Sequence, residues 1–422
     1  MKILVIGSGA REHALCWRIK RSPSCTTLFC TPGNAGIAHE AECLTIAADD
    51  IAGLVAWCVA EQPDLVVVGP DNTLELGIAD RLHEVNIPCF GPTRAAAQIE
   101  WSKAFMKDLA REAGIPTAAY GRFTDLTAAE TFINGMTAPI VVKADGLALG
   151  KGVLICQSRN EALNAARDML SGELFGKAGA EIVVEEFLHG FEVSYFALVD
   201  GDTVVPLASA QDHKRAFDGD KGPNTGGMGA ISPAPHFDAE LEQLVLTTVM
   251  QPLARTLVDK DTPYRGVVFA GLMIQDGKPV LIEFNARFGD PETQSIMRRW
   301  ADDPVPYLLA TAKGELDRVL THPQMSGETA LGVFMAAKGY PDAYKKRTVV
   351  RVPDVQDEHV TVFHASTALE NGHLVNMGGR TLTVVATAQD PATAQKRAYA
   401  FVDQIDWPEG FCRRDIGWRA LA

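Results

Sequence analysis

Short apolar stretches alternate with segments of helical character over the first hundred residues, and this alternation constrains the fold more than any other feature of the chain. Strands are expected at 3–6, 27–30, 64–68 and 88–90, with helices at 11–21 and 74–85. Such alternation predicts a parallel, doubly wound sheet, in which ligands bind at the carboxyl ends of the strands. Those ends are glycine-rich and comprise Gly7–Gly9, Pro32–Gly36 and Gly69–Asp71, so the backbone there can approach a ligand closely.

The loop after the first expected strand carries part of a dinucleotide-binding motif. It reads GSGARE over residues 7–12, so Glu12 stands where G-x-G-x-x-G requires its third glycine. A bulky acid opposes close packing of helix on strand, and its charge is unfavourable beside a pyrophosphate. We therefore reject a dehydrogenase that binds NAD or FAD, and we expect the N–H groups of this loop to bind a single phosphate.

A glycine-rich hairpin is expected in the second quarter of the chain. One strand runs into Lys143, a loop at 146–152 carries Lys151, and a returning strand follows at 153–156. The loop is not a P-loop, because Gly152 stands where Ser or Thr is required and a strand follows in place of a helix. A lysine on a strand beneath a glycine-rich hairpin is the kinase-like way of holding ATP phosphates, although a plain hairpin explains the pattern equally well.

Carboxylates follow the next expected strand, at 181–186. This strand ends in EEFL over residues 185–188, and Glu192 lies four residues further on. Backbone groups there could bind an adenine edge and Glu192 the ribose hydroxyls, whereas each carboxylate taken alone is explained as solvated surface. The polar, glycine-rich stretch at 209–229 is long for a loop inside a compact domain, so we expect an ordered substrate loop.

The segment EFNARFGDPETQ, residues 283–294, carries the strongest chemical pattern. Glu283 and Asn285 lie two apart at the end of an expected strand, so both side chains share one face. Two hard oxygen donors suit Mg²⁺, which completes its coordination with water and phosphate oxygens. Arg287 would follow on that face if the strand continued, where a cation could stabilise a transferring phosphoryl group. Taken alone, Glu-x-Asn is more simply an acidic strand end running into a turn.

Length and charge limit the remaining possibilities. A chain of 422 residues predicts two to four domains, and a net charge of −14 argues against general binding to nucleic acid or anionic membranes. The eight cysteines form no C-x-x-C pair, and no signal peptide or long apolar run is present. We therefore expect reduced thiols and a cytoplasmic location.

Three domains are expected from the changes of character along the chain. Long helices are predicted at 94–113 and 239–257, and strands at 330–336, 360–364, 374–376 and 381–386 precede a helix at 392–404. We place an N-terminal substrate domain at 1–101, a central domain at 102–325 with a flap subdomain at about 117–192, and a small α+β domain at 326–422.

These features occur in the order typical of the ATP-grasp superfamily. The segments KILVIGSGAREHAL, VVKADGLALGKGV, GPNTGGMG and EFNARFGDPETQ most closely resemble the phosphoribosylamine–glycine ligase family, and the resemblance runs from residue 1 to about residue 420. It implies a multidomain α/β and α+β protein with an N-terminal doubly wound parallel sheet, a central ATP-grasp fold and a small C-terminal α+β domain. Leu149 and Trp101 depart from the expected pattern, although neither removes a group that the chemistry needs.

The resemblance also implies a reaction. Members of the family use ATP to ligate glycine to 5-phosphoribosylamine through glycyl phosphate, giving glycinamide ribonucleotide, ADP and phosphate in the second step of de novo purine biosynthesis. We therefore expect Mg²⁺ or Mn²⁺ as cofactor. The expected partners are the small molecules ATP, glycine and 5-phosphoribosylamine, without nucleic acid or membrane, and we expect a monomer.

Site residues follow from the same resemblance, position by position. The implied ATP-binding residues are Lys103, Lys143, Gly146, Gly150, Lys151, Gly152, Glu185, Glu186, Phe187, Leu188 and Glu192. The implied metal ligands are Glu283 and Asn285, and the implied catalytic residues are Arg287, Asp290 and Glu292. The implied substrate-binding residues are Gly9, Gly33, Asn34, Gly36, Asp212, His213, Lys214, Asn224, Thr225, Gly226, Gly227 and Arg380.

Two other classes of protein remain as alternatives. A different ATP-grasp ligase or carboxylase would share Lys143, Glu192, Glu283 and Asn285, but it would lack the acceptor-side segments found here. A non-catalytic nucleotide sensor would keep the hinge and flap but lose the metal ligands or Arg287. Both are retained in this chain, which favours a ligase.

Overall fold

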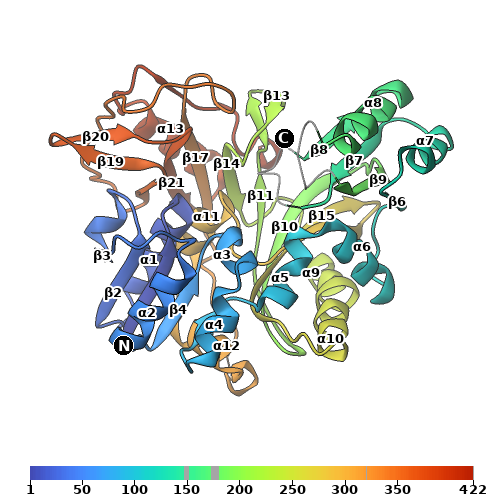
Figure 1. The fold of residues 1–422 in the computed structure, drawn as a ribbon. Helices are drawn as coiled ribbons and strands as arrows, with labels where there is room; N and C mark the ends of the chain where they lie inside the picture. The colour runs from blue at the N-terminus through green and yellow to red at the C-terminus, as the bar shows by residue number, and fades with distance from the viewer. Residues whose placement is uncertain (147–151, 173–179, 320, 422) are drawn as a thin grey trace.

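The computed structural model describes residues 1–146, 152–172, 180–319 and 321–421 of the chain. A five-stranded sheet, a nine-stranded sheet, a four-stranded sheet and two short hairpins account for the strands in these residues. Figure 1 shows the N-terminal sheet beside the long central sheet, with the four-stranded sheet and its helices set apart at one side. In this part of the chain, no helix is long and apolar enough to cross a membrane.

The N-terminal sheet has the order β3-β2-β1-β4-β5, and all its strands are parallel. Its strands are β1 Lys2–Gly7, β2 Thr27–Pro32, β3 Glu42–Cys43, β4 Leu65–Val68 and β5 Cys89–Phe90, and its helices are α1 Ala10–Lys20, α2 Ile51–Glu61, α3 Asp71–Glu75 and α4 Ile78–Glu84. Successive residues of β1 enter different cores, Ile3 and Val5 on one face and Leu4 and Ile6 on the other. Burial on both faces explains the unbroken apolar run, and the predicted doubly wound sheet is confirmed.

Two helices that the sequence predicts as continuous are broken. The helix expected at 74–85 consists of α3 and α4, which are separated at Gly77, whose φ is +81°. The helix expected at 94–113 consists of α5 Arg94–Trp101 and α6 Lys103–Glu112. Between them the backbone of Ser102 is extended, and its hydroxyl accepts the N–H of Phe105 at 3.1 Å as the N-cap of α6.

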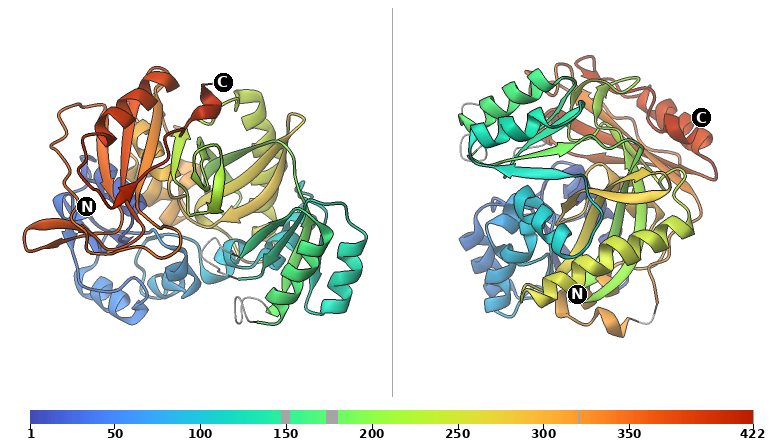
Figure 2. Two further views of the ribbon diagram at one scale, coloured as in Figure 1. Left: turned by 90° about the horizontal axis from the view of Figure 1, so that it is seen from above. Right: turned by 90° about the vertical axis from the view of Figure 1, so that its right-hand side faces the viewer.

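The flap subdomain is a four-stranded antiparallel sheet, β6-β9-β7-β8, covered by two helices. Its elements are β6 Tyr120–Phe123, α7 Leu126–Asn134, β7 Ile140–Ala144, β8 Val153–Cys156, α8 Arg159–Leu170 and β9 Ile182–Glu186. It buries a hydrophobic core drawn from its own residues, among them Ile133, Val142, Met169 and Val184. Both further views keep it at the edge of the molecule (Figure 2), as expected of a unit that can move as one body.

The central sheet continues without interruption into the C-terminal region. Its order is β16-β15-β10-β11-β14-β17-β21-β18, with β22 paired to β17. The strands are β10 Phe191–Asp200, β11 Thr203–Asp212, β14 Gly229–Ser232, β15 Arg265–Gln275, β16 Lys278–Asn285, β17 Thr329–Ala337, β18 Val360–His364, β21 Arg380–Ala388 and β22 Gly410–Phe411. Because β14 pairs with β17, the expected C-terminal domain extends a sheet that the central domain begins.

Helices and two hairpins complete the fold. The helix expected at 239–257 comprises α9 Ala239–Val245, a π-helical turn at Leu246–Met250 and α10 Gln251–Asp259. The remaining helices are α11 Glu292–Arg299, α12 Val305–Lys313 and α13 Pro391–Val402, and the second hairpin pairs β19 Thr367–Glu370 with β20 His373–Asn376. The prediction that residues 209–229 form a single loop is wrong. Strand β11 runs to Asp212, and β12 Arg215–Phe217 then pairs with β13 Lys221–Asn224.

Candidate active site

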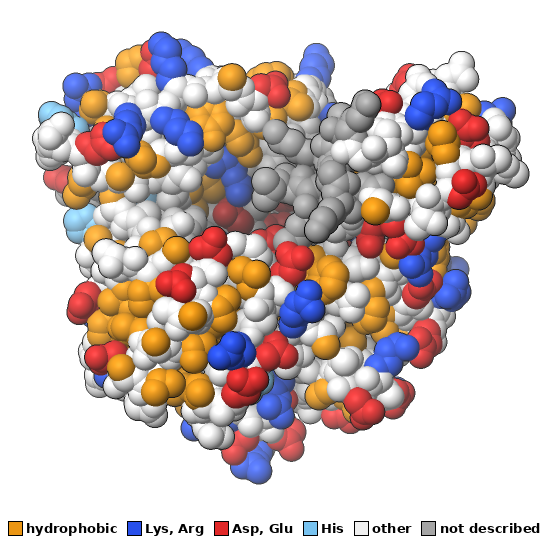
Figure 3. All heavy atoms as spheres, in the orientation of Figure 1, with side chains coloured by type: hydrophobic (Ala, Val, Ile, Leu, Met, Phe, Trp, Pro, Cys, Tyr) orange, Lys and Arg blue, Asp and Glu red, His pale blue; other side chains and the backbone are white. Residues whose placement is uncertain are grey.

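Charged side chains from several elements line the floor of a hollow between the flap subdomain and the C-terminal region (Figure 3). On the flap side, Lys143 of β7 forms an ion pair with Glu185 of β9, and both side chains are buried. Lys103 begins α6 and donates to the carbonyl of Gly146 at 3.3 Å. Burial lowers the pKa of Lys103 while the nearby carboxylate of Glu283 opposes the shift. The lysines predicted to hold ATP phosphates therefore lie beside the predicted metal strand.

The predicted flap loop is described only at its two ends. Gly146 contacts Lys103 as above, and the carbonyl of Gly152 accepts the N–H of Ala144 at 2.8 Å. The predicted ATP-binding residues Gly150 and Lys151, and the unusual Leu149, lie outside the described residues.

The strand predicted to line the adenine places its two glutamates differently. Glu185 points inward, where burial would raise its carboxyl pKa but the ammonium groups of Lys143 and Lys107 lower it. Glu186 is exposed and accepts the N–H of Ala119 at 3.0 Å. Phe187 and Leu188 follow the strand and are half-buried. Glu185 is therefore not the solvated surface charge that the sequence allows.

Glu192 is the second residue of β10 and pairs with Lys214 at 2.9 Å. This ion pair lowers the pKa of Glu192. Burial, with the repulsion of Glu292, Glu192 and Glu283, raises the pKa of Asp212 to about 7. The carboxylates of Asp212, Glu192 and Glu283 raise the pKa of Lys214 well above its usual value, although burial opposes them. The structure thus brings the predicted ribose-binding, acceptor-binding and metal-binding carboxylates around one ammonium group.

The predicted metal strand has its two donors on one face, as the period of two requires. Glu283 pairs with Gly271 of the neighbouring strand, where a Cβ would lie 3.3 Å from the Glu283 Cγ. Asn285 Oδ1 accepts from Arg287 at 3.2 Å, while Asn285 Nδ2 is buried without a partner. No group of three or more His, Cys, Asp or Glu side chains in the described ranges could hold a metal ion. A carboxylate with an amide fits Mg²⁺ bound mainly through substrate phosphates and water.

Arg287 lies beyond the end of β16 and is fixed by a residue that the sequence analysis missed. Its guanidinium pairs with Glu100 of α5 at 2.7 Å, and the other Glu100 oxygen accepts the N–H of Ala286 at 2.8 Å. Burial would lower the pKa of Arg287, but Glu100 and Asp71 raise it further. Its Nε is buried without a partner. Arg287 is therefore held in its charged form, and its Nε has no hydrogen-bond acceptor within the protein.

Asp290 joins the predicted acceptor segments. Its carboxylate lies 3.3 Å from Arg380 and accepts from Gln294 at 2.8 Å. The Arg380 guanidinium also donates to the carbonyl of Gly226 at 2.6 Å. A Cβ on Gly227 would lie 2.4 Å from the Pro291 ring, so glycine alone allows these two segments to touch. Arg380 therefore joins GPNTGGMG to RFGDPE, and its role in substrate binding stays a prediction.

Glu292 is the most deeply buried of the predicted catalytic residues. It begins α11 and accepts the Ser194 hydroxyl at 3.0 Å. Burial raises its pKa. Its side chain also fills the space beside Gly289, where a Cβ would lie 2.4 Å from its carboxylate. Glu292 therefore packs against the backbone of Gly289 in the RFGDPE segment and binds Ser194.

The glycine loop after β1 differs from the expectation of a phosphate site. Glu12 is buried, and its carboxylate accepts the N–H of Gly9 at 2.6 Å and the Arg11 guanidinium at 2.6 Å. A Cβ on Gly7 or Gly69 would lie within 2.4 Å of the Glu12 side chain. The loop is therefore closed by its own carboxylate. Gly9 nevertheless lies beside Asp290, whose carboxylate would be 3.7 Å from a Cβ at this position.

The next predicted loop, Gly33–Gly36, ties the N-terminal sheet to β18. The amide nitrogen of Asn34 donates to the carbonyls of Ser8 at 2.8 Å and His364 at 2.9 Å, and its oxygen accepts the N–H of Gly36 at 2.8 Å. A Cβ on Gly36 would collide with His364 and His13. Asn34 therefore uses both ends of its amide within the protein.

The β12–β13 hairpin is held by residues near 415, which the sequence analysis did not connect to it. Arg413 is buried and pairs with Asp220 at 2.9 Å and Asp415 at 2.8 Å. His213 Nε2 accepts the N–H of Gly417 at 3.0 Å. We call Arg413, Asp220, Asp415 and His213 the clasp. At the other end of the hairpin, where Asn224 pairs with Arg215, the Thr225 hydroxyl donates to the Lys214 carbonyl at 2.8 Å.

Three models of one family match this chain along its length. Phosphoribosylglycinamide synthetase, N domain, matches residues 1–100; the ATP-grasp (A) domain of the same synthetase matches 101–293; and its C domain matches 330–419. The phosphoribosylamine–glycine ligase of Mesorhizobium japonicum is 51% identical over 423 residues, which cover 100% of this chain and 99% of that protein. The chain belongs to the phosphoribosylglycinamide synthetase family. The predicted family and its ligase activity are confirmed.

Solved structures agree with this assignment to the phosphoribosylglycinamide synthetase family. The phosphoribosylamine–glycine ligase of Thermotoga maritima superposes with a TM-score of 0.88 at 31% identity, covering 99% of this chain and 100% of that one. The biotin carboxylase domain of Hydrogenobacter thermophilus 2-oxoglutarate carboxylase reaches 0.74 at 16% identity, covering 97% and 91%. The second likeness shows the shared fold alone, and the multidomain architecture predicted from the sequence is confirmed. Enzymes with this fold generally use ATP together with Mg²⁺ or Mn²⁺.

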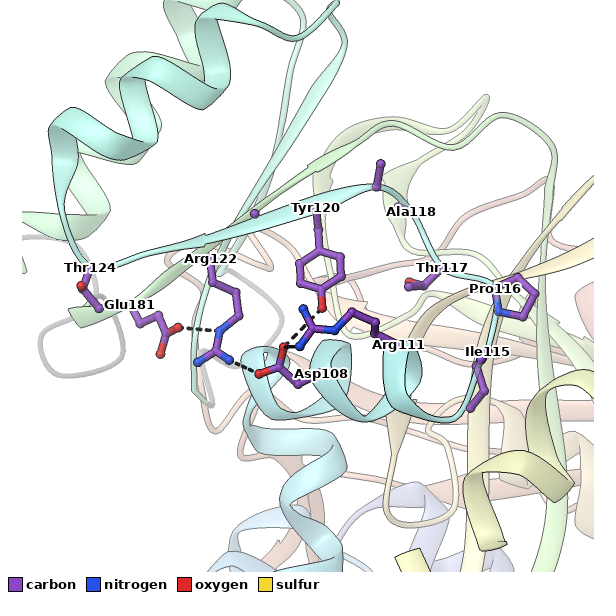
Figure 4. Close-up of a pocket in the computed structure, with 13 residues that line it drawn as sticks. Asp108, Arg111, Ile115, Pro116, Thr117, Ala118, Tyr120, Arg122, Thr124 and Glu181 are labelled. Atoms are coloured by element: carbon purple, nitrogen blue, oxygen red, sulfur yellow. Dashed lines mark hydrogen bonds and ion pairs between the residues drawn. The ribbon is translucent and has the colours of Figure 1, made fainter. Parts of the chain in front are cut away.

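One cavity in the described residues has a volume of about 1010 Å³. It opens between α6 and β6 and is lined by Asp108, Arg111, Tyr120, Arg122 and Glu181, among others (Figure 4). None of the predicted site residues contributes to its lining. The cavity therefore lies at the junction between α6 and the flap subdomain.

Proposed function

We propose that the chain joins glycine to 5-phosphoribosylamine with ATP, through glycyl phosphate, at the site built from β16, the flap sheet and the RFGDPE loop. One observation carries the proposal. Glu283, Asn285 and Arg287 lie between the flap lysines and the acceptor segments joined by Arg380, and two of their donors, Asn285 Nδ2 and Arg287 Nε, are buried without partners. Buried unpaired donors are costly, so their presence supports a site that a polar substrate completes.

In the first step, the glycine carboxylate attacks the γ-phosphoryl group of ATP in line, and ADP leaves. Lys143 and Lys103 would hold the phosphates, and Arg287 would stabilise the charge that develops on the transferring group. Glu283 and Asn285 would hold Mg²⁺ or Mn²⁺, which supplies Lewis-acid neutralisation of phosphate charge. The Asn285 oxygen has a second lone pair, so it can keep its contact with Arg287.

In the second step, the amino group of phosphoribosylamine attacks the acyl carbon, the bond to phosphate breaks, and the amine loses a proton. The acceptor would lie against Gly9, Asp290 and the segment at 224–227, which the structure brings together. No protein nucleophile is needed, because the acyl phosphate is already activated. Asp212 and Lys214 would face the same space from β11 and the loop that follows it.

Glycyl phosphate must be shielded from water. The glycine-rich loop at 146–152 and the GPNTGGMG segment at 222–229 are both candidate lids, but the second is bound on several sides. Arg380 holds the carbonyl of Gly226, and the Tyr340 hydroxyl accepts the Gly226 N–H at 3.3 Å. We therefore assign GPNTGGMG to a fixed wall and closure to the flap subdomain.

The deciding experiment is ADP release with Mg²⁺-ATP while glycine or phosphoribosylamine is omitted in turn. Phosphoribosylamine can be generated in place from ribose 5-phosphate and ammonia. Release that requires both substrates, with stoichiometric glycinamide ribonucleotide, is the expected result. Release with neither substrate, or no release under any combination, would contradict the proposal and return another ATP-grasp acceptor or a nucleotide sensor as the better interpretation.

We also propose that the protein works in the cytoplasm as a monomer. The eight cysteines are free thiols, and burial raises the pKa of several of them, including Cys58 to about 12, which favours inert thiols in a reducing compartment. Light scattering at micromolar concentration tests the oligomeric state, and a mass of twice 45.5 kDa would contradict a monomer.

A further inference from the structure

Lys107 is the most deeply buried lysine of the flap junction, and no step of the reaction described above uses it. It lies on α6 with 0% of its side chain exposed. Its ammonium lies 2.5 Å from Glu185 Oε2, while Lys143 contacts the other oxygen of the same carboxylate. A buried charge is costly unless it is paired, yet here two lysines share one carboxylate. With two ammonium groups and one carboxylate, the three side chains carry a net charge of +1.

The remaining contacts of Lys107 place this positive charge beside residues 115–117, which join α6 to the flap subdomain and are called the hinge below. Its ammonium donates to the Thr117 hydroxyl at 2.7 Å, and that hydroxyl donates to the carbonyl of Leu281 at 2.8 Å. The Leu281 N–H in turn donates to the carbonyl of Pro116 at 2.7 Å. Leu281 lies two residues before the metal candidate Glu283 on β16. Figure 4 shows Thr117 on the chain that leads from α6 into β6.

The ammonium group of Lys107 is therefore linked both to the flap sheet and to β16, the two parts of the proposed ATP site. It reaches the flap sheet through Glu185 and the metal strand through Thr117. Burial lowers the pKa of Lys107, and the Glu185 carboxylate opposes that shift. The other nearby acid, Glu186, is exposed and bound to Ala119, so solvent screens its charge.

We propose that Lys107 is a positioning residue for the ATP phosphates, which occupies one oxygen of Glu185 so that the Lys107–Glu185–Lys143 group presents a net positive charge to them. The inference rests on the proposed function, because it takes Lys143 as a phosphate-binding residue. Without Lys107, Glu185 and Lys143 form a neutral pair, and Lys143 is held by its carboxylate alone. The phosphates then gain little from approaching it.

The charge argument predicts a dependence on phosphate number that a merely structural role would not give. Dissociation constants of AMP, ADP and ATP are measured by calorimetry on the full chain, for the unaltered protein, Lys107→Met and Lys107→Arg. In Lys107→Met, ATP affinity should fall roughly tenfold or more, ADP affinity by less, and AMP affinity by about twofold at most. Lys107→Arg keeps the charge and should retain most of the preference for ATP. An equal fall for all three nucleotides, or no fall, would overturn the proposal.

A second variant keeps the test sharp if Lys107→Met is poorly folded. The double variant Lys107→Met/Glu185→Gln removes one charge of each sign and restores the net charge on Lys143. Its ratio of ATP to AMP affinity should recover toward that of the unaltered protein, whatever Glu185 contributes to adenine binding. A ratio as low as in Lys107→Met alone would refute the charge mechanism.

A surface lysine supplies the matched control. Lys260 pairs with Glu112 at 2.6 Å and is about one third exposed, so Lys260→Met should leave all three dissociation constants unchanged. If the unaltered protein binds no ATP and ligates no glycine, the proposed function itself fails. If it does both and Lys107→Met keeps its ratio, only the inference about Lys107 fails.

Discussion

The two sides of the candidate site are held together by different means. On the acceptor side, Arg380 and Arg413 join segments far apart in the chain, and Arg413 is completely buried. On the nucleotide side, the flap subdomain has a core of its own and meets the central sheet through the hinge at 115–117. In the proposed mechanism, a fixed acceptor side would orient a small amine against the acyl carbon, whereas a separately packed flap would open for ATP and close over it.

Glu283 is the proposed metal ligand on the nucleotide side, and replacing it should reduce activity most. Glu283→Gln keeps the shape but removes the charge that would hold Mg²⁺, so turnover should fall about a thousandfold or more, while ATP still binds weakly. Steady-state ADP release with both substrates measures the loss. Asp276→Asn in the β15–β16 turn, where φ is +51° and Asn is tolerated, is the control and should keep full activity. Full activity in Glu283→Gln would rule out the metal assignment.

Arg413 is the buried arginine of the clasp on the acceptor side, and replacing it should reduce stability. Arg413→Met leaves Asp220 and Asp415 without their buried partner, which should cost about 3–5 kcal/mol of unfolding free energy. Denaturant unfolding measures it. The neighbouring Arg414 pairs with Asp403 on the surface, and both side chains are about half exposed, so Arg414→Met should change stability by at most about 1 kcal/mol. Equal losses in the two variants would show that the clasp is not a rigid element.

Lowering the pH should reduce the free energy of unfolding because of His213 on the acceptor side. Its pKa is lowered to about 4 by burial and by Arg413 and Arg419, so the unfolded chain binds a proton that the folded protein does not. The stability from neutral His213 is complete above about pH 6.5 and is lost as pH falls toward 4, a contribution of about 3 kcal/mol. His213→Gln should flatten the curve of unfolding free energy against pH over this window. His322→Gln, at an exposed position, is the control, and an unchanged slope in His213→Gln would contradict the assignment.

Arg122 lies at the surface of the junction between α6 and β6, and replacing it should have a small effect. Arg122 of β6 contacts Asp108 of α6 and pairs with Glu181 at 2.8 Å, beside the cavity of Figure 4. These side chains are about one quarter to one third exposed, so Arg122→Gln should cost at most about 1 kcal/mol. ADP affinity should change by at most about twofold. A larger loss of affinity would mean that this surface pair, and not the buried Lys107 group, sets the position of the flap.

Local patterns predict the parts of the fold that local physics decides. Apolar runs bounded by Gly and Pro identify the parallel strands, and the period of two places Glu283 and Asn285 on one face. The break at Ser102 is different, because no Gly or Pro marks it. Its carboxylate partner Asp145, which accepts the N–H of Ala104 at 3.0 Å, lies some forty residues away. Such a tertiary contact overrides helix propensity without leaving a local trace.

Long-range pairs explain what the sequence could not predict at the site. Glu100 meets the Arg287 segment across 186 residues, and His213 meets Gly417 across 204. Glu12 was recognised as a misfit to a dinucleotide loop, yet its contact with the N–H of Gly9 requires the folded geometry of the loop. The segment FCRRDIGWRA, residues 411–420, has three arginines and one aspartate, but no local pattern shows that Arg413 and Arg414 contact the β12–β13 hairpin and its turn.

The clasp also has a consequence for biosynthesis. The turn of the hairpin, at Asp218, receives the N–H of Arg414 across 196 residues. At roughly 5–20 residues per second of translation, the hairpin waits some tens of seconds on the ribosome before its arginine is made. During that time the Asp218 and Asp220 carboxylates lack the arginine partners that they contact in the folded protein. The order of synthesis therefore leaves Asp218 and Asp220 without Arg413 and Arg414 until the chain is almost complete.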